Sequence, residues 1–233
     1  MKISLVIPAY NESLIIEDTV RAADDYLAGH FEDYELIAVD DGSTDGTAEI
    51  LKGLCSDRVR MLGYQDNRGK GYAVRCGMLA ADGDILLYTD ADLAYGLDNI
   101  ELVARLFEET DADIIIGSRK LQADGYEGYP LARFLASKCF SFLTMLASGM
   151  RYDTQCGFKG FRRAAAQEIF AKCVVDGFAF DFEVMLLAED FCKITQIPVK
   201  IINHRYSKVR IIRDSARMLR EIMAIKRRKR SGK

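Results

Sequence analysis

The chain has 233 residues, of which 49% are hydrophobic, so it can bury one core or a core with a small subdomain. It contains no apolar run long enough to span a bilayer, no expected secretory signal before Pro8, and only two histidines, which argues against a histidine-based metal centre. The net charge of −3 hides a split, because residues 1–128 hold 26 acidic and 11 basic side chains and residues 129–233 hold 9 and 21.

The first 120 residues alternate apolar runs typical of strands with amphipathic helical patterns. The expected strands are 3–7, 35–39, 59–62, 84–89 and 113–116, and the expected helices are 13–29, 45–54, 70–81 and 97–109. Ser43 or Thr44 is the expected N-cap of the second helix. Strands and helices that alternate at this spacing predict a parallel sheet with right-handed crossovers, flanked by helices.

Polar side chains follow the expected strands at the point where each strand ends. They are Tyr10, Asn11 and Glu12, then Asp40 and Asp41, then Asp90 and Asp92, and finally Arg119. Because ligands bind outside the carboxyl ends of the strands in such sheets, we expect these side chains to converge on one rim.

Asp90-Ala91-Asp92 follows the buried-type strand 84–89. Two carboxylates with this spacing can hold Mg²⁺ or Mn²⁺ against a diphosphate, because these cations prefer oxygen ligands and share the phosphate oxygens of a substrate. An ordinary polar turn is the alternative for such a triplet taken alone.

Gly69-Lys70-Gly71 precedes the helix expected over 70–81. The glycines would let the backbone approach a phosphate, and Lys70 would add a positive charge. A tight turn without a ligand is the alternative.

The second half is basic and departs from the alternation of strands and helices. Residues 131–150 are strongly apolar but include Arg133 and Lys138, which predicts an interfacial amphipathic helix, with a buried core helix as the alternative. Residues 208–233 hold 11 basic and 2 acidic side chains, and 209–230 has a helical pattern. We expect attachment to an anionic membrane surface; a solvated tail is one alternative, and nucleic-acid binding is disfavoured because no recognition motif accompanies the charge.

The six cysteines form no C-x-x-C pair. In a chain without an expected secretory signal, this favours buried reduced thiols over disulfides or zinc ligands. The uneven charge of the two halves predicts different partners for them, or acidic and basic faces that balance within one fold.

Five motifs in chain order carry a resemblance to a known family: Pro8-Ala9-Tyr10-Asn11-Glu12, Val39-Asp40-Asp41-Gly42-Ser43, Arg68-Gly69-Lys70-Gly71, Asp90-Ala91-Asp92 and Gly117-Ser118-Arg119. Together they resemble the family-two glycosyltransferases of GT-A fold. The segment 153–161 and Ser207-Lys208, with Arg133 and Ser137, extend the resemblance to about residues 1–210. These later residues are most similar to the dolichyl- or polyprenyl-phosphate β-glucosyltransferases and next to the dolichol-phosphate mannosyltransferases.

The resemblance implies a GT-A, Rossmann-like, mostly parallel sheet flanked by helices, with amphipathic interfacial helices in the C-terminal half. We expect one catalytic domain over 1–208, made of a nucleotide-sugar half, 1–120, and an acceptor half, 121–208. A basic amphipathic helix and tail would occupy 209–233. The implied location is cytoplasmic, on the inner face of a membrane, without a transmembrane helix.

The resemblance also implies site residues in three groups. The nucleotide-sugar group is Pro8, Tyr10, Glu12, Asp41, Lys70 and Asp90, and the ligands of Mg²⁺ or Mn²⁺ are Asp90 and Asp92. The lipid-phosphate group is Arg119, Arg133, Ser137 and Lys208, with Lys159 and Arg162 as weaker candidates. Asp92, Arg119 and Asp181 are the expected catalytic residues.

Other interpretations of single residues stay open. Asp40 is expected to be structural and to bond backbone amides, and Arg119 could pair with Asp113 instead of binding phosphate. The mannosyl branch usually has a glutamine as a further metal ligand where this chain has Ala94, which implies looser metal binding and favours the glucosyl branch.

The implied reaction is a metal-dependent, inverting transfer of a hexose, with UDP-glucose favoured as donor, to a polyprenyl or dolichyl phosphate. The product would be a β-linked sugar-phosphate lipid. Because a lipid phosphate is already an anion, its attack needs cations that hold it in line rather than a strong base.

Alternatives within the enzyme class are mannosyl transfer from GDP-mannose, or transfer to a saccharide hydroxyl with Asp181 or Glu183 as base. A phosphorylatable receiver domain also gathers aspartates at strand ends, but it is about half this length and has a lysine after its fifth strand. Here Gly117-Ser118-Arg119 follows the fifth expected strand.

Overall fold

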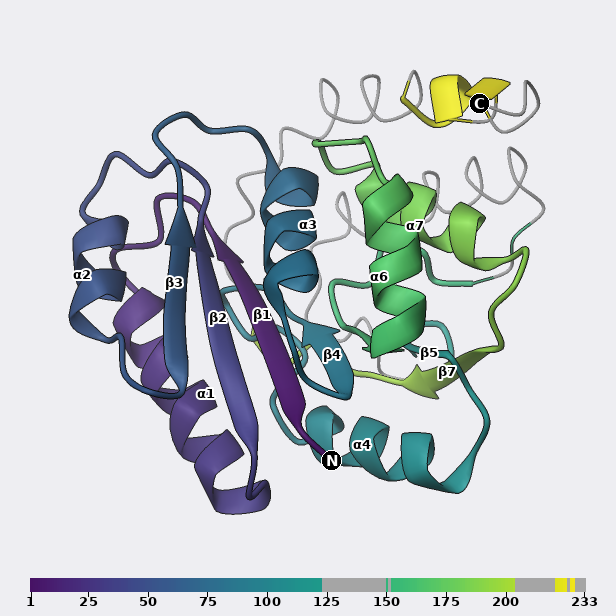
Figure 1. Ribbon diagram of the computed structural model, residues 1–233, viewed down its shortest axis with the longest axis horizontal. Helices are drawn as coiled ribbons and strands as arrows, with labels where there is room; N and C mark the ends of the chain where they lie inside the picture. Colours follow the sequence, from purple (N-terminus) through teal and green to yellow (C-terminus); the bar gives the residue numbers. More distant parts are fainter. Residues whose placement is uncertain (123–149, 151, 204–220, 226, 229–233) are drawn as a thin grey trace.

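The computed structural model describes residues 1–122, 150, 152–203, 221–225 and 227–228, which form one sheet with helices on both faces (Figure 1). In spatial order the strands are β3 (Val59–Gly63), β2 (Tyr34–Asp40), β1 (Ile3–Ala9), β4 (Ile85–Tyr88), β6 (Lys159–Arg162), β5 (Ile114–Ser118) and β7 (Ile194–Pro198). The helices are α1 (Ile16–His30), α2 (Thr47–Gly53), α3 (Lys70–Ala80), α4 (Asn99–Glu109), α6 (Arg163–Lys172) and α7 (Phe180–Ala188).

Two apolar cores lie on opposite faces of the sheet. β1 and β2 are buried at every residue, as expected for strands of a parallel sheet that helices cover on both sides. Helices α1 and α4 pack Val20 and Phe107 onto one face, and α3 and α6 pack Val74 and Phe170 onto the other. The predicted fold class, a mostly parallel sheet flanked by helices, is therefore confirmed.

The strand β6 is the main departure from the predicted topology. Every strand and helix expected in the first 120 residues is present, with bounds within three residues of those expected. However, β6 lies antiparallel between β4 and β5, where a purely parallel alternation has no strand. Its sequence, Lys-Gly-Phe-Arg, contains neither an apolar run nor a clear alternation, so periodicity did not reveal it.

The predicted N-cap of α2 is wrong. The helix begins at Thr47, and the cap position is Gly46, whose φ of 91° lies in the left-handed region. Ser43 Oγ instead accepts a hydrogen bond from the backbone N–H of Asn11 at 2.9 Å, and the Thr44 N–H donates to Asn11 Oδ1 at 2.8 Å. Both residues thus join the loops that follow β1 and β2, which keeps those two loops in fixed relation.

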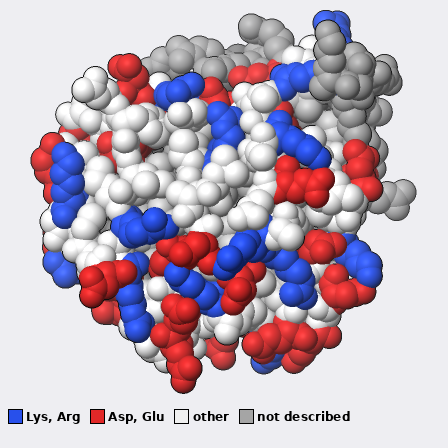
Figure 2. Space-filling view, in the orientation of Figure 1, with Lys and Arg blue, Asp and Glu red and all other residues white. Residues whose placement is uncertain are grey.

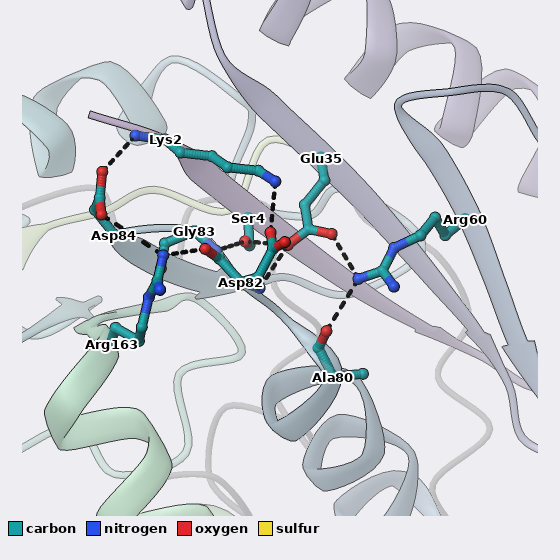
Figure 3. Close-up of polar contacts among 9 residues, drawn as sticks. All are labelled: Lys2, Ser4, Glu35, Arg60, Ala80, Asp82, Gly83, Asp84 and Arg163. Carbon is teal, nitrogen blue, oxygen red and sulfur yellow. Dashed lines mark hydrogen bonds and ion pairs between the residues drawn. The ribbon is translucent and has the colours of Figure 1, made fainter.

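The amino-terminal edge of the sheet is held by a polar network around Glu35 (Figure 3). Glu35 Oε1 accepts from Ser4 Oγ at 2.6 Å, and Glu35 Oε2 accepts from Arg60 Nη2 at 2.6 Å. Ser4 Oγ in turn accepts from the Gly83 N–H at 2.7 Å. Ser4 is thus a buried hydroxyl with a donor and an acceptor partner, at the end of the sheet away from the predicted rim.

Charged side chains of both signs are interspersed on the face shown in Figure 2, without a separate acidic or basic patch. Most of the basic residues of 204–233 lie outside the described residues. The five described cysteines are free thiols, of which Cys156 and Cys173 are buried, whereas Cys55 is exposed and corrects the expectation of burial. Among the described helices, none is long and apolar enough to cross a membrane.

Candidate active site

The carboxyl ends of β1, β2 and β4 lie on the same side of the sheet, and the loops that follow them carry the predicted site residues (Figure 1). Pro8 is buried within β1, and Tyr10 after it is exposed. Asp92 follows β4, and the charge of Glu12 acts on the Asp92 carboxyl. The structure therefore brings the first loop and the Asp90–Asp92 loop together.

Asp92 lies in a crowded acidic environment. Burial, and then the neighbouring carboxylate of Asp90, raise the pKa of Asp92, and Glu12 acts in the same direction. The loop is held in place because Asn203 Nδ2 donates to the Asp92 carbonyl at 2.7 Å and the Ile202 N–H donates to the Ala94 carbonyl at 2.8 Å. A divalent cation would relieve the repulsion between Asp90 and Asp92.

Lys70 reaches this acidic site from the first turn of α3. Its Nζ forms an ion pair with Asp90 Oδ1. Burial opposes the charge of Lys70, but Asp90 and then Asp181 outweigh it and raise the pKa of Lys70. The glycine-rich segment and the aspartate pair, which the sequence treats as separate motifs, thus meet in one charged cluster.

Gly69 and Gly71 lie close to a neighbouring backbone segment. A Cβ on Gly69 would lie 2.5 Å from the Asp176 carbonyl oxygen, and a Cβ on Gly71 would lie 2.5 Å from that of Val175. The Arg75 guanidinium also donates to Asp176 Oδ1 at 2.7 Å. These glycines therefore let α3 pack against the backbone of 175–176, which fixes Lys70 at the rim.

Asp41 is buried, and both of its carboxylate oxygens accept hydrogen bonds from the loop after β3. It accepts from the Tyr64 hydroxyl at 2.7 Å, from Asn67 Nδ2 at 2.8 Å, and from the N–H groups of Arg68 and Gly69 at 2.9 Å. Four donors occupy the lone-pair directions of a carboxylate. Asp41 thus holds the loop that leads into α3, while Asp40 accepts from the Ser43 backbone N–H at 3.3 Å, as expected of a structural residue.

Arg119 is only 6% exposed, and its guanidinium faces Asp153. Its Nε donates to Asp153 Oδ2 at 2.9 Å and its Nη2 donates to Oδ1 at 2.8 Å, a bidentate pair. The alternative partner, Asp113, instead accepts from the Lys193 N–H with Oδ2. Asp153 could not be paired with Arg119 from sequence, because the two are 34 residues apart.

A buried polar triad of Lys159, Asp181 and Tyr88 lies behind the rim and was not predicted. Lys159 is 0% exposed and Asp181 is 4% exposed. Asp181 Oδ1 accepts from Lys159 Nζ and, at 2.6 Å, from the Tyr88 hydroxyl. Burial, and then Asp181, raise the pKa of Tyr88, so its hydroxyl stays protonated as a donor. Lys159 is therefore an internal partner of Asp181, which corrects its weak candidacy for lipid phosphate.

Glu183 also has structural partners. Its Oε2 accepts from the N–H groups of Val174 and Val175 at 2.9 and 2.8 Å, and Arg228 lies 3.6 Å from Oε1. Arg162 donates to the carbonyl oxygens of Ala112 and Phe107. Neither side chain is directed to a substrate in these contacts. Arg133, Ser137 and Lys208 lie outside the described residues, as do 131–149 and 209–220 of the expected interfacial helices.

The absence of a side chain at Gly157 leaves space for the Asp90 carboxylate. A Cβ at this position would lie 2.8 Å from Asp90 Cγ and closer still to Oδ2. The segment 153–157 therefore spans the rim, since it pairs with Arg119 at one end and contacts the Asp90 carboxylate at the other.

We expect Gly157→Ala to lower transfer activity by about a hundredfold with little loss of stability, because the Asp90 carboxylate must leave its present position. Gly29→Ala is the matched control, since a Cβ there meets nothing within 4 Å. Initial rates and urea unfolding of both variants measure the effect. Unchanged rates in Gly157→Ala would show that the position of Asp90 is unimportant.

The donor set fits a divalent cation bound jointly by protein and substrate. No group of three or more His, Cys, Asp and Glu side chains that could hold a metal occurs within the described part of the chain. Asp90 and Asp92 supply two hard oxygen ligands, and burial, followed by repulsion from Asp90, raises the pKa of Asp92; a bound cation would oppose both effects. Such a pair suits Mg²⁺ or Mn²⁺, which commonly take further ligands from phosphate and water.

Several known proteins are similar to this chain in sequence. The family model described as Glycosyl transferase family 2 matches residues 4–170. A Drosophila melanogaster protein named dolichyl-phosphate beta-glucosyltransferase is 35% identical over 226 residues, which cover 90% of this chain and 68% of that protein. The human protein of the same name is 32% identical, over 89% of this chain and 68% of its own length.

A solved structure shares the fold. Glucosyl-3-phosphoglycerate synthase from Mycobacterium tuberculosis, in complex with Mn²⁺, UDP-glucose and phosphoglyceric acid, superposes with a TM-score of 0.68 at 21% identity. The match covers 96% of this chain and 78% of that one. The predicted GT-A fold is thereby confirmed.

Proposed function

Because the chain belongs to glycosyltransferase family 2, we propose that it transfers glucose from a nucleotide sugar to dolichyl phosphate or a related polyprenyl phosphate. The relatives of known name support this acceptor and this sugar. UDP-glucose is the proposed donor, which the Mn²⁺ and UDP-glucose complex of the structural neighbour supports.

The state of Asp181 is the observation that favours a phosphate acceptor over a hydroxyl acceptor. Its carboxylate is buried and engaged by Lys159 and Tyr88, and Glu183 is engaged by backbone N–H groups. A hydroxyl acceptor needs a base that can reach its proton. A lipid phosphate is already ionised and can attack the anomeric carbon without one.

Each group at the rim has a role in this reaction. Asp90 and Asp92 would hold Mg²⁺ or Mn²⁺, which supplies charge neutralisation for the leaving diphosphate. Glu12 and Tyr10 would line the nucleotide, and Lys70 would reach a donor phosphate from its position beside Asp90. Displacement in line by the lipid phosphate inverts the anomeric centre, so an α-linked donor gives a β-linked product.

Arg119 is proposed to act on the acceptor side through its place beside the 153–157 segment. Direct contact with the lipid phosphate would use Arg133, Ser137 and Lys208. We further propose that 131–150 and 209–230 attach the protein to a membrane surface on its cytoplasmic side. In this scheme 1–208 is the catalytic domain and 209–233 its basic attachment.

The test is a transfer assay with defined components. The protein is incubated with polyprenyl phosphate, Mg²⁺ or Mn²⁺, and a panel of UDP- and GDP-sugars, and the organic phase is analysed by mass. We expect a hexosyl-phosphate lipid from UDP-glucose that disappears when the metal is chelated. A mannolipid formed from GDP-mannose, or hexose transferred only to a water-soluble saccharide, would contradict the proposal.

A further inference from the structure

Two buried polar atoms at the rim have no hydrogen-bond partner among the described residues: Ser118 Oγ and Gln155 Nε2. Ser118 is 1% exposed and ends β5. Leaving a buried donor unpaired is unfavourable, and such groups in native structures call for an explanation. A third such atom, Thr89 Oγ1, belongs by strand alternation with Leu87 on the opposite face of the sheet and is not part of this pair.

Ser118 lies on the same face of the sheet as the donor site. By strand alternation it shares the face of Ile114 and Ile116, which belong to the same core as Tyr88. The Gly117 N–H donates to the Phe158 carbonyl at 3.0 Å, so the next register position sets Ser118 opposite Gly157. Gly157 in turn adjoins Asp90. Two strand spacings, roughly 9–10 Å, therefore separate Ser118 from Asp90.

Gln155 is held by a loop that is fixed at several points. Asp153 is pinned by Arg119, and its carbonyl accepts from the Cys156 N–H at 3.1 Å. Lys159 Nζ donates to the Cys156 carbonyl at 2.6 Å from below. The loop is thus preorganised, and a small shift of the backbone that would give Gln155 an internal partner has to break these contacts.

We propose that Gln155 Nε2 and Ser118 Oγ bind hydroxyl groups of the hexose that is transferred, and so select the sugar. Both groups are neutral, which suits sugar hydroxyls, whereas the diphosphate and the lipid phosphate are expected to take the charged groups of the rim. A site built to hydrogen-bond a hydroxyl discriminates strongly against an analogue that lacks it. The inference rests on the proposed function, since it names the sugar contacts of that same site.

The test compares the affinities of UDP and UDP-glucose, measured by calorimetry with Mg²⁺, in the wild type, Ser118→Ala and Gln155→Met. We expect each variant to bind UDP with the affinity of the wild type. The ratio of UDP-glucose affinity to UDP affinity should be about tenfold lower in each variant than in the wild type. Monodeoxy analogues of UDP-glucose identify the hydroxyl concerned. The wild type should bind the analogue that lacks this hydroxyl as weakly as the variant binds UDP-glucose, and the variant should bind the analogue and UDP-glucose with equal affinity.

Ser4→Ala is the matched control for Ser118→Ala. Both serines are buried, but Ser4 has internal partners at the other end of the sheet (Figure 3). Ser4→Ala should lower the midpoint of unfolding and leave the ratio of UDP-glucose affinity to UDP affinity unchanged. Ser118→Ala should not lower the midpoint of unfolding. Equal loss of UDP and UDP-glucose affinity, or an effect confined to the KM of the lipid phosphate, would overturn the inference. A wild type that makes no glucolipid would instead contradict the proposed function.

Discussion

Replacing Asp92 with asparagine is expected to lower glucosyl transfer by at least about a hundredfold while the fold stays intact. The change removes a negative ligand from the Asp90–Asp92 pair, which is the part of the described chain that can share a cation with a diphosphate. Burial, and then the charges of Asp90 and Glu12, raise the pKa of Asp92, so loss of its charge should not destabilise the folded protein. The free energy of unfolding should therefore be equal to or above that of the wild type.

Rates of glucolipid formation over a range of Mn²⁺ concentrations measure this effect, and urea unfolding measures stability. Asp98→Asn is the matched control, because Asp98 lies six residues further on, is exposed and makes no side-chain cap to α4. A wild-type rate in Asp92→Asn at saturating metal would show that Asp92 does not bind the cation.

The buried pair of Lys159 and Asp181 carries the second large effect. Lys159→Met leaves the Asp181 carboxylate buried without its cation, which is expected to lower the free energy of unfolding by about 3–5 kcal/mol. Lys159→Met/Asp181→Leu removes both charges and should regain most of that loss. The cycle is completed with Asp181→Leu and measured by urea unfolding.

The exposed pair of Lys172 and Glu168 on α6 provides the comparison. Its side chains are 54% and 51% exposed, and Lys172→Met should change the free energy of unfolding by about 0.5 kcal/mol or less. A Lys159→Met variant as stable as Lys172→Met would mean that the buried charge is compensated in another way.

The variant Asp181→Asn distinguishes between two roles for Asp181. As a positioning residue, Asp181 supports Lys159 and the charge of Lys70, and Asp181→Asn should retain measurable transfer because the amide can still accept from Tyr88 and Lys159. As a general base it would be needed for the chemistry itself. Complete loss of transfer in a fully folded Asp181→Asn, with substrate binding unchanged, would favour the base and a hydroxyl acceptor.

The sequence by itself determined the parallel part of the sheet and the position of its ligand-binding edge. Strands such as 3–7 and 35–39 are mostly apolar, with Ser4 and Glu35 as their polar residues, because helices bury both of their faces, so their signal is local and strong. The residues that follow the expected strands, such as Glu12 and Asp90, could therefore be assigned to one rim. The family was equally accessible, since its motifs are short and contiguous.

The tertiary structure alone decided which partner each of these polar groups has within the protein. Asp41 is saturated by the loop after β3, Arg119 is paired with Asp153, and Asp181 is paired with Lys159 across 22 residues. A buried charge takes its role from the partner that folding brings to it, and that partner can lie anywhere in the chain. The insertion of β6, which places Gly157 against Asp90, depends in the same way on pairing between distant strands rather than on any local pattern.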